Sequence, residues 1–294
     1  MTKQIIYVAQ LLRMKQWVKN FFIFFPLIFA GQLFQIQSAL DTLLTFIAFC
    51  LIASGVYVFN DLLDIEKDRL HPKKSKRPLA KGHVHKPLII GLILFLILIG
   101  LGLSSWVDHA IFAIASLYVL LHIIYNFYAK RVVIVDVMFV AAGFQIRIWA
   151  GSLAAGVFPS EWLQMCVFLL ALYLGFTKRR YELSTLKEEA ANHRRVLTHY
   201  TSYLLDQIII ICSTLTVVFY GLYVLSPSVT ERLGNSYMVY SMVFVIYGVF
   251  RYLYLIHVKK LGDDPGDVIF GDFPLLLSIL LWFSYILILF YFRT

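Results

Sequence analysis

The chain has 294 residues, of which 60% are hydrophobic and only 15% are charged, and its mean hydropathy is +0.78. This composition excludes a water-soluble globular protein and predicts an all-α, polytopic membrane protein. The formal net charge of +9 does not require a nucleic-acid partner, because basic residues gather on the cytosolic side of membrane proteins.

Apolar runs of about the ~20 residues needed to cross a bilayer recur along the chain, and they predict a bundle of nine transmembrane helices. The expected spans are Asn20–Gln37, Thr42–Phe59, Pro87–Val107, His109–Ala129, Val132–Phe158, Trp162–Thr177, Gln207–Thr230, Leu233–Phe250 and Phe273–Tyr291. No linker or shift in composition separates them, which predicts a single integral-membrane domain over residues 1–294.

The basic residues alternate between the two sides of this arrangement. Most of the 26 Lys and Arg precede the first span or lie in every second connection after it. The positive-inside rule then places the N-terminus in the cytosol and the C-terminus on the opposite side. We expect a multi-pass protein of the inner (plasma) membrane. Two cytosolic connections, Asn60–Lys86 and Lys178–Tyr203, are long and highly charged. We expect them to cap a cavity, and hence an active site, that opens to the cytosol.

An acidic cluster follows the second span. Asp61, Asp64 and Asp68 are spaced i, i+3 and i+7, which on a helix places them on one face, with Asn60 beside them. Carboxylates on one face repel one another unless a cation lies between them, and hard oxygen ligands suit Mg²⁺. We therefore predict Asn60, Asp61, Asp64 and Asp68 as Mg²⁺ ligands, with the three aspartates catalytic. The alternative is a solvated helix end whose acids balance neighbouring Lys and Arg.

Basic residues flank this cluster. The loop His71–Pro78 is dense in positive charge, and its Lys73 and Arg77 are predicted to bind phosphate. The segment Arg13–Asn20 has two interpretations. It is an interfacial anchor with Trp17 at headgroup level, or its Lys19 and Asn20 contact a phosphate.

A second polar group surrounds the fifth span and comprises Tyr125, Lys130, Asp136 and Arg147. Asp136 and Arg147 lie on nearly the same face of a helix, roughly 16 Å apart. Ionisable residues inside a span normally face a polar cavity, so we expect both to face one, with Arg147 deepest. The alternative is an interhelical ion pair that only fixes the packing.

A third polar group follows the sixth span: Lys178, Arg179, Arg180 and Glu182. Consecutive cations supply donors in several directions, and arginine matches phosphate oxygens, so this group is predicted to bind phosphate. Glu182 either orients these cations or reaches a metal. The alternative for the cations is ordinary positive-inside charge.

The acidic cluster resembles the N-D-x-x-D-x-x-x-D motif of the UbiA superfamily of intramembrane prenyltransferases, and Arg77-Pro78-Leu79 is also typical of it. The resemblance covers essentially the whole chain. It implies a nine-helix fold and binding of Mg²⁺–diphosphate at the motif. The chain departs from many members where they carry a second aspartate-rich motif, because Lys178-Arg179-Arg180-Tyr181-Glu182 stands there instead.

The chain instead resembles the decaprenyl-phosphate phosphoribosyltransferase-like branch. The residues that carry this resemblance are Arg13 and Gln16-Trp17-Val18-Lys19-Asn20, Tyr125 and Lys130, Asp136 and Arg147, and Lys178-Arg179 with Glu182. That branch transfers a 5-phosphoribosyl group from 5-phosphoribosyl-1-diphosphate to a polyprenyl phosphate, with release of pyrophosphate, and in some bacteria serves cell-envelope synthesis. The implied partners are these two substrates, Mg²⁺ and the lipid bilayer. A homo-oligomer is left open. The alternatives are prenyl transfer from a polyprenyl diphosphate to an aromatic or other acceptor, and transport of a lipid or ion.

Overall fold

The computed structural model describes residues 10–70, 74–82, 86–186, 195–262 and 264–292, and the described residues form helices and turns without a strand. The chain divides into two compact units. The first unit comprises residues 1–129 and 146–158, and the second comprises residues 130–145 and 159–294. Helix α7 (Val135–Ala155) contributes its first half to the second unit and its second half to the first unit.

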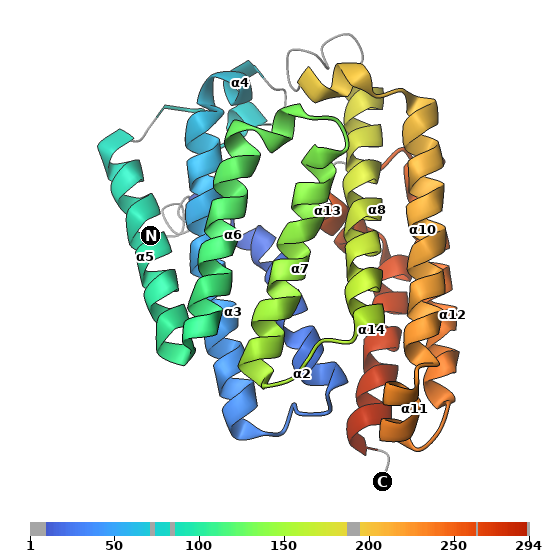
Figure 1. The fold of residues 1–294 in the computed structure, drawn as a ribbon. Helices are drawn as coiled ribbons and strands as arrows, with labels where there is room; N and C mark the ends of the chain where they lie inside the picture. Colours follow the sequence, from blue (N-terminus) through green and yellow to red (C-terminus); the bar gives the residue numbers. More distant parts are fainter. Residues whose placement is uncertain (1–9, 71–73, 83–85, 187–194, 263, 293–294) are drawn as a thin grey trace. The chain divides into compact units, whose positions relative to one another are not determined.

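In the first unit, the long helix α3 packs against η1, α5 and α6 (Figure 1). The elements of this unit besides α7 are η1 (Met14–Phe24), α2 (Phe25–Phe29), α3 (Ile36–Leu63), α4 (Ile65–Leu70), η2 (Lys74–Lys76), α5 (Lys86–Val107) and α6 (His109–Phe127). Its core contains the fully buried side chains of Ile23, Phe49 and Tyr118. Asp108 begins α6 by accepting a hydrogen bond from the backbone N–H of Ala110, as expected of an N-cap.

In the second unit, α8 packs along α10, and α12 packs against α10 and α14. The elements of this unit are α8 (Glu161–Leu186), η5 (Arg195–His199), α10 (Ser202–Val224), α11 (Pro227–Leu233), η6 (Tyr237–Ser241), α12 (Met242–His257), α13 (Pro265–Gly271), α14 (Phe273–Leu287) and η7 (Ile288–Phe292), with η3 (Ala129–Arg131) at the boundary between the units. Thr201 and Asp272 cap the N-termini of α10 and α14 with their side chains.

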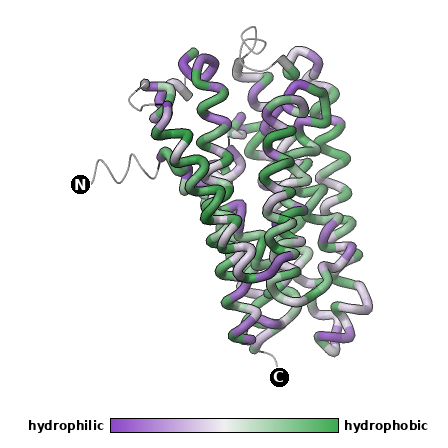
Figure 2. Tube along the Cα trace, turned by 60° about the vertical axis from the view of Figure 1, so that its left-hand side comes forward, coloured by the Kyte–Doolittle hydropathy of each residue, from purple (hydrophilic) through white to green (hydrophobic). Residues whose placement is uncertain are grey.

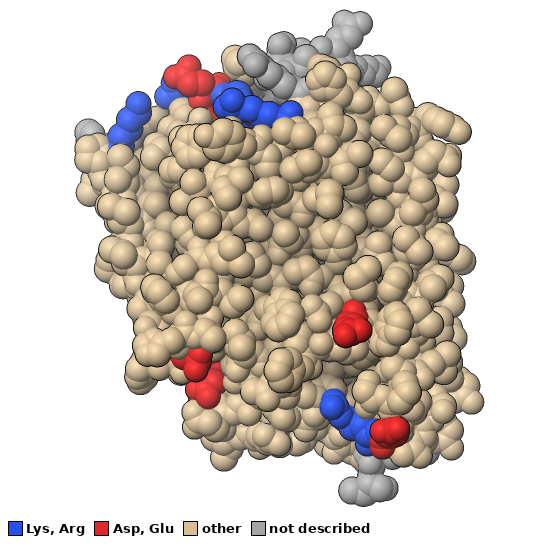
Figure 3. Space-filling model, in the orientation of Figure 1, with Lys and Arg blue, Asp and Glu red and all other residues tan. Residues whose placement is uncertain are grey.

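The described residues contain 7 helical segments long and apolar enough to cross a membrane. They are Ile36–Leu63, Lys86–Val107, His109–Arg131, Val135–Ala155, Ser202–Val224, Tyr237–His257 and Phe273–Phe292. Hydrophobic residues predominate along these helices, and polar residues gather near their ends (Figure 2). On the face drawn in Figure 3, the described charged side chains are few and lie toward helix ends. The protein is therefore an integral membrane protein.

Two of the nine expected spans are absent from these segments. The expected span Asn20–Gln37 is not continuous, since η1 ends at Phe24, α2 ends at Phe29 and α3 begins only at Ile36. Pro26 lies in the first turn of α2, and Gly31 has a positive φ of 70°, which ends the helical path. The expected span Trp162–Thr177 lies within α8, whose apolar part is bounded by Glu161 and Lys178. The count of nine stays a prediction.

Gly151 of α7 lies directly against the backbone of η1. A Cβ atom at this position would stand 1.9 Å from the carbonyl oxygen of Ile23, so no side chain fits there. We expect Gly151→Ala to destabilise the protein by about 1–3 kcal/mol or more through overpacking, seen as a lower melting temperature in detergent. Gly102→Ala on α5 is the matched control, because nothing lies within 4 Å of its added methyl group. Equal melting temperatures for the two variants would contradict this close approach.

Candidate active site

The acidic cluster begins on α3 and ends on α4. α3 ends at Leu63, and Asp64 caps it with φ −102° and ψ 12°, so the helix on which the spacing places the acids on one face is interrupted at Asp64. Aspartate is a weak helix former, which accounts for the break at this position. The backbone bonds nevertheless continue in helical order. The N–H of Asp64 donates to the Asn60 carbonyl at 3.0 Å, and the N–H of Asp68 donates to the Asp64 carbonyl at 2.8 Å.

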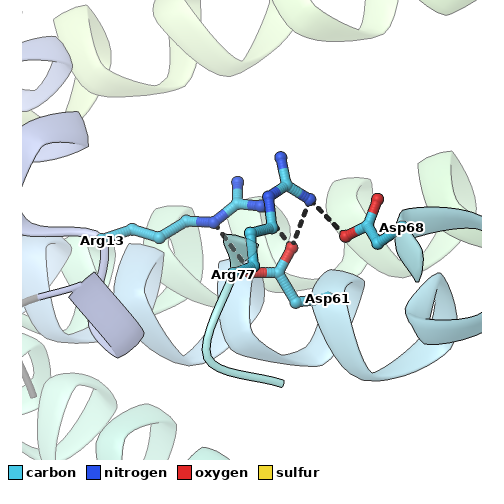
Figure 4. A network of polar contacts seen from close by, with 4 residues as sticks. All are labelled: Arg13, Asp61, Asp68 and Arg77. Carbon is cyan, nitrogen blue, oxygen red and sulfur yellow. Dashed lines mark hydrogen bonds and ion pairs between the residues drawn. The ribbon is translucent and has the colours of Figure 1, made fainter. Parts of the chain in front are cut away.

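Two of these carboxylates converge on two arginines of the same unit (Figure 4). Nη1 of Arg77 lies 2.9 Å from Oδ1 of Asp61 and 2.5 Å from Oδ2 of Asp68, so a single nitrogen bridges both acids. Arg13 donates from Nε to Oδ2 of Asp61 at 2.9 Å, and its Nη2 bonds to Oδ1. Arginines thus balance the acids, as the alternative interpretation requires. The acids are not solvated, however, since Asp61 is 6% and Asp68 is 4% exposed.

The donor set fits a magnesium ion in part. No group of three or more His, Cys, Asp and Glu side chains in the described part of the chain is arranged to hold a metal ion. Asp61 and Asp68 do face one cationic nitrogen, and Mg²⁺ is commonly held by one or two carboxylates together with substrate phosphates. Asp64 and Asn60 are half-buried beside them. Lys73 lies outside the described residues.

The N-terminal segment is attached to α3 by polar contacts. The indole N–H of Trp17 donates to Oγ of Ser54 at 2.9 Å, and the Ser54 hydroxyl donates to the carbonyl of Leu12 at 2.8 Å. Trp17 therefore packs against α3 of its own unit. The anchor interpretation instead expects this side chain at the level of the lipid headgroups. Asn20 is fully buried and donates to Sγ of Cys50 at 3.2 Å, while Lys19 is half-buried on η1.

Arg147 is buried in the first unit with its guanidinium held from two sides. Its Nε donates to Oδ1 of Asn20 at 2.7 Å, and its Nη2 donates to the hydroxyl of Tyr118 at 2.7 Å. The guanidinium carbon also lies 4.7 Å from the centre of the Tyr118 ring. The contacts fix a positive charge in the interior of the unit. Tyr125, also expected in this polar group, is half-buried on α6.

Asp136 belongs to a different network, in the second unit. It is fully buried, and its Oδ2 accepts from Nε of Arg179 at 2.7 Å. The hydroxyl of Tyr200 donates to Oδ1 of Asp136 at 3.1 Å. Burial, and then the nearby carboxylate, raise the pKa of Tyr200 to about 12, so the phenol stays a hydrogen-bond donor at neutral pH. Asp136 of α7 and Arg179 of α8 thus form an interhelical ion pair.

Arg179 and Arg180 of α8 also bind two other acidic side chains. Nη1 of Arg179 donates to Oε2 of Glu182 at 2.9 Å, which places Glu182 where it orients this arginine. Nε of Arg180 lies 2.9 Å from Oδ1 of Asp206 on α10. Lys178 is half-buried on α8, and Lys130 is half-buried on η3.

Sequence reasoning missed several members of these networks. Tyr118 and Tyr200 carry no signal, since single tyrosines in or beside apolar helices are common. Asp206 offers a weak signal, because an acid at the start of an apolar span needs a partner. Arg13 has the same character as the other N-terminal basic residues. The structure distinguishes it by its contact with Asp61.

Comparison with known proteins identifies relatives over most of the chain. The profile of the UbiA prenyltransferase family matches residues 21–266. A decaprenyl-phosphate phosphoribosyltransferase of Corynebacterium glutamicum is 30% identical, over 92% of this chain and 82% of the relative. A protein of the same name from Mycolicibacterium smegmatis is 29% identical, over 92% and 88% respectively. The solved structure of a UbiA homolog from Archaeoglobus fulgidus bound to DMAPP and Mg²⁺ has the same fold, with a TM-score of 0.73 over 96% of this chain and 98% of that chain at 16% identity.

Proposed function

This chain belongs to the UbiA prenyltransferase family and is a membrane transferase, and we propose that it transfers a 5-phosphoribosyl group from 5-phosphoribosyl-1-diphosphate to a polyprenyl phosphate. The observation that carries this substrate choice is the similarity, at 30% identity over 92% of the chain, to a relative named decaprenyl-phosphate phosphoribosyltransferase. We further propose a nine-helix bundle in the inner (plasma) membrane, with its N-terminus and its active site on the cytosolic side.

The charge of the polar groups supports the proposal. The reaction brings together a diphosphate, a 5-phosphate and a lipid phosphate, so it needs more cations than prenyl transfer to a neutral acceptor. The chain supplies such cations in the described residues at Lys19, Arg77, Lys130, Arg147, Lys178, Arg179 and Arg180, and outside them at Lys73. Arg147 is the most favourable of them for a deep phosphate, because its buried guanidinium is already oriented by Asn20 and Tyr118.

The acidic cluster after the second expected span is proposed to bind the metal ion rather than a phosphate. Asn60, Asp61, Asp64 and Asp68 would hold Mg²⁺, which supplies neutralising charge to the departing pyrophosphate. The lipid phosphate then attacks the anomeric carbon from the face opposite the leaving group. Its oxygen is already ionised at neutral pH, so the chain does not need a general base of the kind that an alcohol nucleophile requires.

A two-substrate assay tests this proposal. Purified protein, Mg²⁺, polyprenyl phosphate and phosphoribosyl diphosphate with a labelled ribose are expected to give a labelled lipid whose mass exceeds that of the acceptor by one phosphoribosyl unit. The same protein should give no product from a prenyl diphosphate and an aromatic acid. Prenylated aromatic product without ribosylated lipid would instead establish the prenyltransferase alternative, and movement of lipid across proteoliposomes without any turnover would establish the transporter alternative.

A further inference from the structure

Two arginines from distant parts of the sequence bind Asp61, and one of them, Arg77, also binds Asp68. Arg13 lies 48 positions before Asp61, and Arg77 lies 16 positions after it. Each guanidinium directs donors at carboxylate oxygens that the proposed function assigns to Mg²⁺ (Figure 4). Nη1 of Arg77 stands between Asp61 and Asp68, where a cation shared by two carboxylates would sit. A metal ion and these guanidinium groups therefore compete for the same oxygen atoms.

We propose, on the basis of the proposed function, that Arg13 and Arg77 hold Asp61 and Asp68 until Mg²⁺ and a diphosphate arrive together, and then transfer their hydrogen bonds to the diphosphate. Mg²⁺ alone gains two carboxylates but separates two guanidinium groups from their partners, which opposes its binding. A diphosphate removes this penalty, because its oxygens accept from arginine as well as carboxylates do. Metal and diphosphate thus bind cooperatively.

The positions of the two arginines allow this exchange without breaking the long helix. Arg13 precedes η1 and has a left-handed backbone with φ 51°, and Arg77 follows η2 in a turn. Neither residue lies on α3, so its side chain can leave Asp61 while the backbone bonds of α3 persist. Arg13 also has a second partner, since its guanidinium carbon lies 5.6 Å from the centre of the Tyr57 ring.

The exchange predicts opposite changes in two binding measurements on Arg77→Gln. The affinity for Mn²⁺ alone, measured from the signal of free Mn²⁺ in electron paramagnetic resonance, should rise by a factor on the order of ten, because a competing cation is gone. Retention of radiolabelled pyrophosphate by immobilised protein at saturating Mg²⁺ should fall by a similar factor, on the order of ten. Arg13→Gln should give the same pair of changes, so the test does not depend on one variant.

Arg251→Gln is the matched control. Arg251 pairs with Asp272 at 2.8 Å, and its side chain is 28% exposed, as is that of Arg77. Both affinities should stay at the wild-type values in this variant. If Mn²⁺ affinity is unchanged or lower in both Arg77→Gln and Arg13→Gln, the two residues are only structural partners of the acids and the exchange is refuted.

These two binding measurements test the exchange independently of the proposed function, because neither of them uses a lipid acceptor or a ribosyl donor. If the arginine variants bind Mn²⁺ more tightly and pyrophosphate more weakly, but the wild type makes no ribosylated lipid, only the proposed reaction is refuted. Ribosylated lipid made by a protein whose arginine variants keep the wild-type Mn²⁺ affinity would refute only the exchange.

Discussion

Asp68→Asn is expected to lower kcat/KM for phosphoribosyl diphosphate by a factor on the order of 10³, since a bound metal contributes several kcal/mol of charge stabilisation to the leaving group. Asparagine keeps the shape of the side chain and removes its charge. Asp68 is 4% exposed and shares Arg77 with Asp61, so its loss leaves one carboxylate where two converged. Initial rates at increasing Mg²⁺ concentration measure the effect, and high Mg²⁺ should restore part of the activity.

Asp272→Asn provides the control for this substitution. Asp272 likewise pairs with one arginine, and asparagine can still cap the N-terminus of α14, so activity should stay close to the wild type. The assignment of the metal is wrong if Asp64→Asn and Asp68→Asn each retain full turnover and an unaltered dependence on Mg²⁺.

Asp136→Asn is expected to lower the free energy of unfolding by about 3–5 kcal/mol, because it removes the fully buried one of the two carboxylates that pair with the buried guanidinium of Arg179 and leaves only Glu182. Asp136 is fully buried, Arg179 is 4% exposed, and the two residues join α7 to α8. Unfolding of the detergent-solubilised protein by heat or SDS measures the change.

Tyr200→Phe is the graded comparison for this prediction. It removes only the hydrogen bond to Oδ1 of Asp136, so we expect a loss of about 1 kcal/mol. The double variant Asp136→Asn, Arg179→Gln should be less destabilising than the sum of the single changes, since it no longer buries a guanidinium that has lost Asp136. Wild-type stability in Asp136→Asn would show that the ion pair does not hold α7 and α8 together.

The sequence predicted the helical class, the membrane setting and most of the spans, because runs such as Phe273–Tyr291 are too apolar to be stable in water. It predicted the first span poorly. Asn20–Gln37 is apolar enough on average, but composition does not reveal that Pro26 and Gly31 divide it. The spacing correctly predicted that Asp61 and Asp68 lie on one side, because the helical order of the backbone hydrogen bonds continues across Asp64.

The partners of the charged residues could not be predicted. Spacing along a helix relates Asp136 to Arg147, yet Asp136 binds Arg179 and Arg147 binds Asn20 and Tyr118. Such choices depend on which helices become neighbours, and the periodicity of one helix contains no information about its neighbours. For the same reason, the N-terminal arginine that reaches Asp61 could not be distinguished from the other basic residues near it.

Coordination of the metal can be measured directly by ³¹P electron–nuclear double resonance on Mn²⁺-loaded protein mixed with phosphoribosyl diphosphate. We expect a ³¹P coupling from phosphate bound to the protein-held Mn²⁺ in the wild type, and its loss in the double variant Asp61→Asn, Asp68→Asn. A coupling of the same strength in the double variant would show that the metal and the diphosphate meet somewhere other than at these carboxylates.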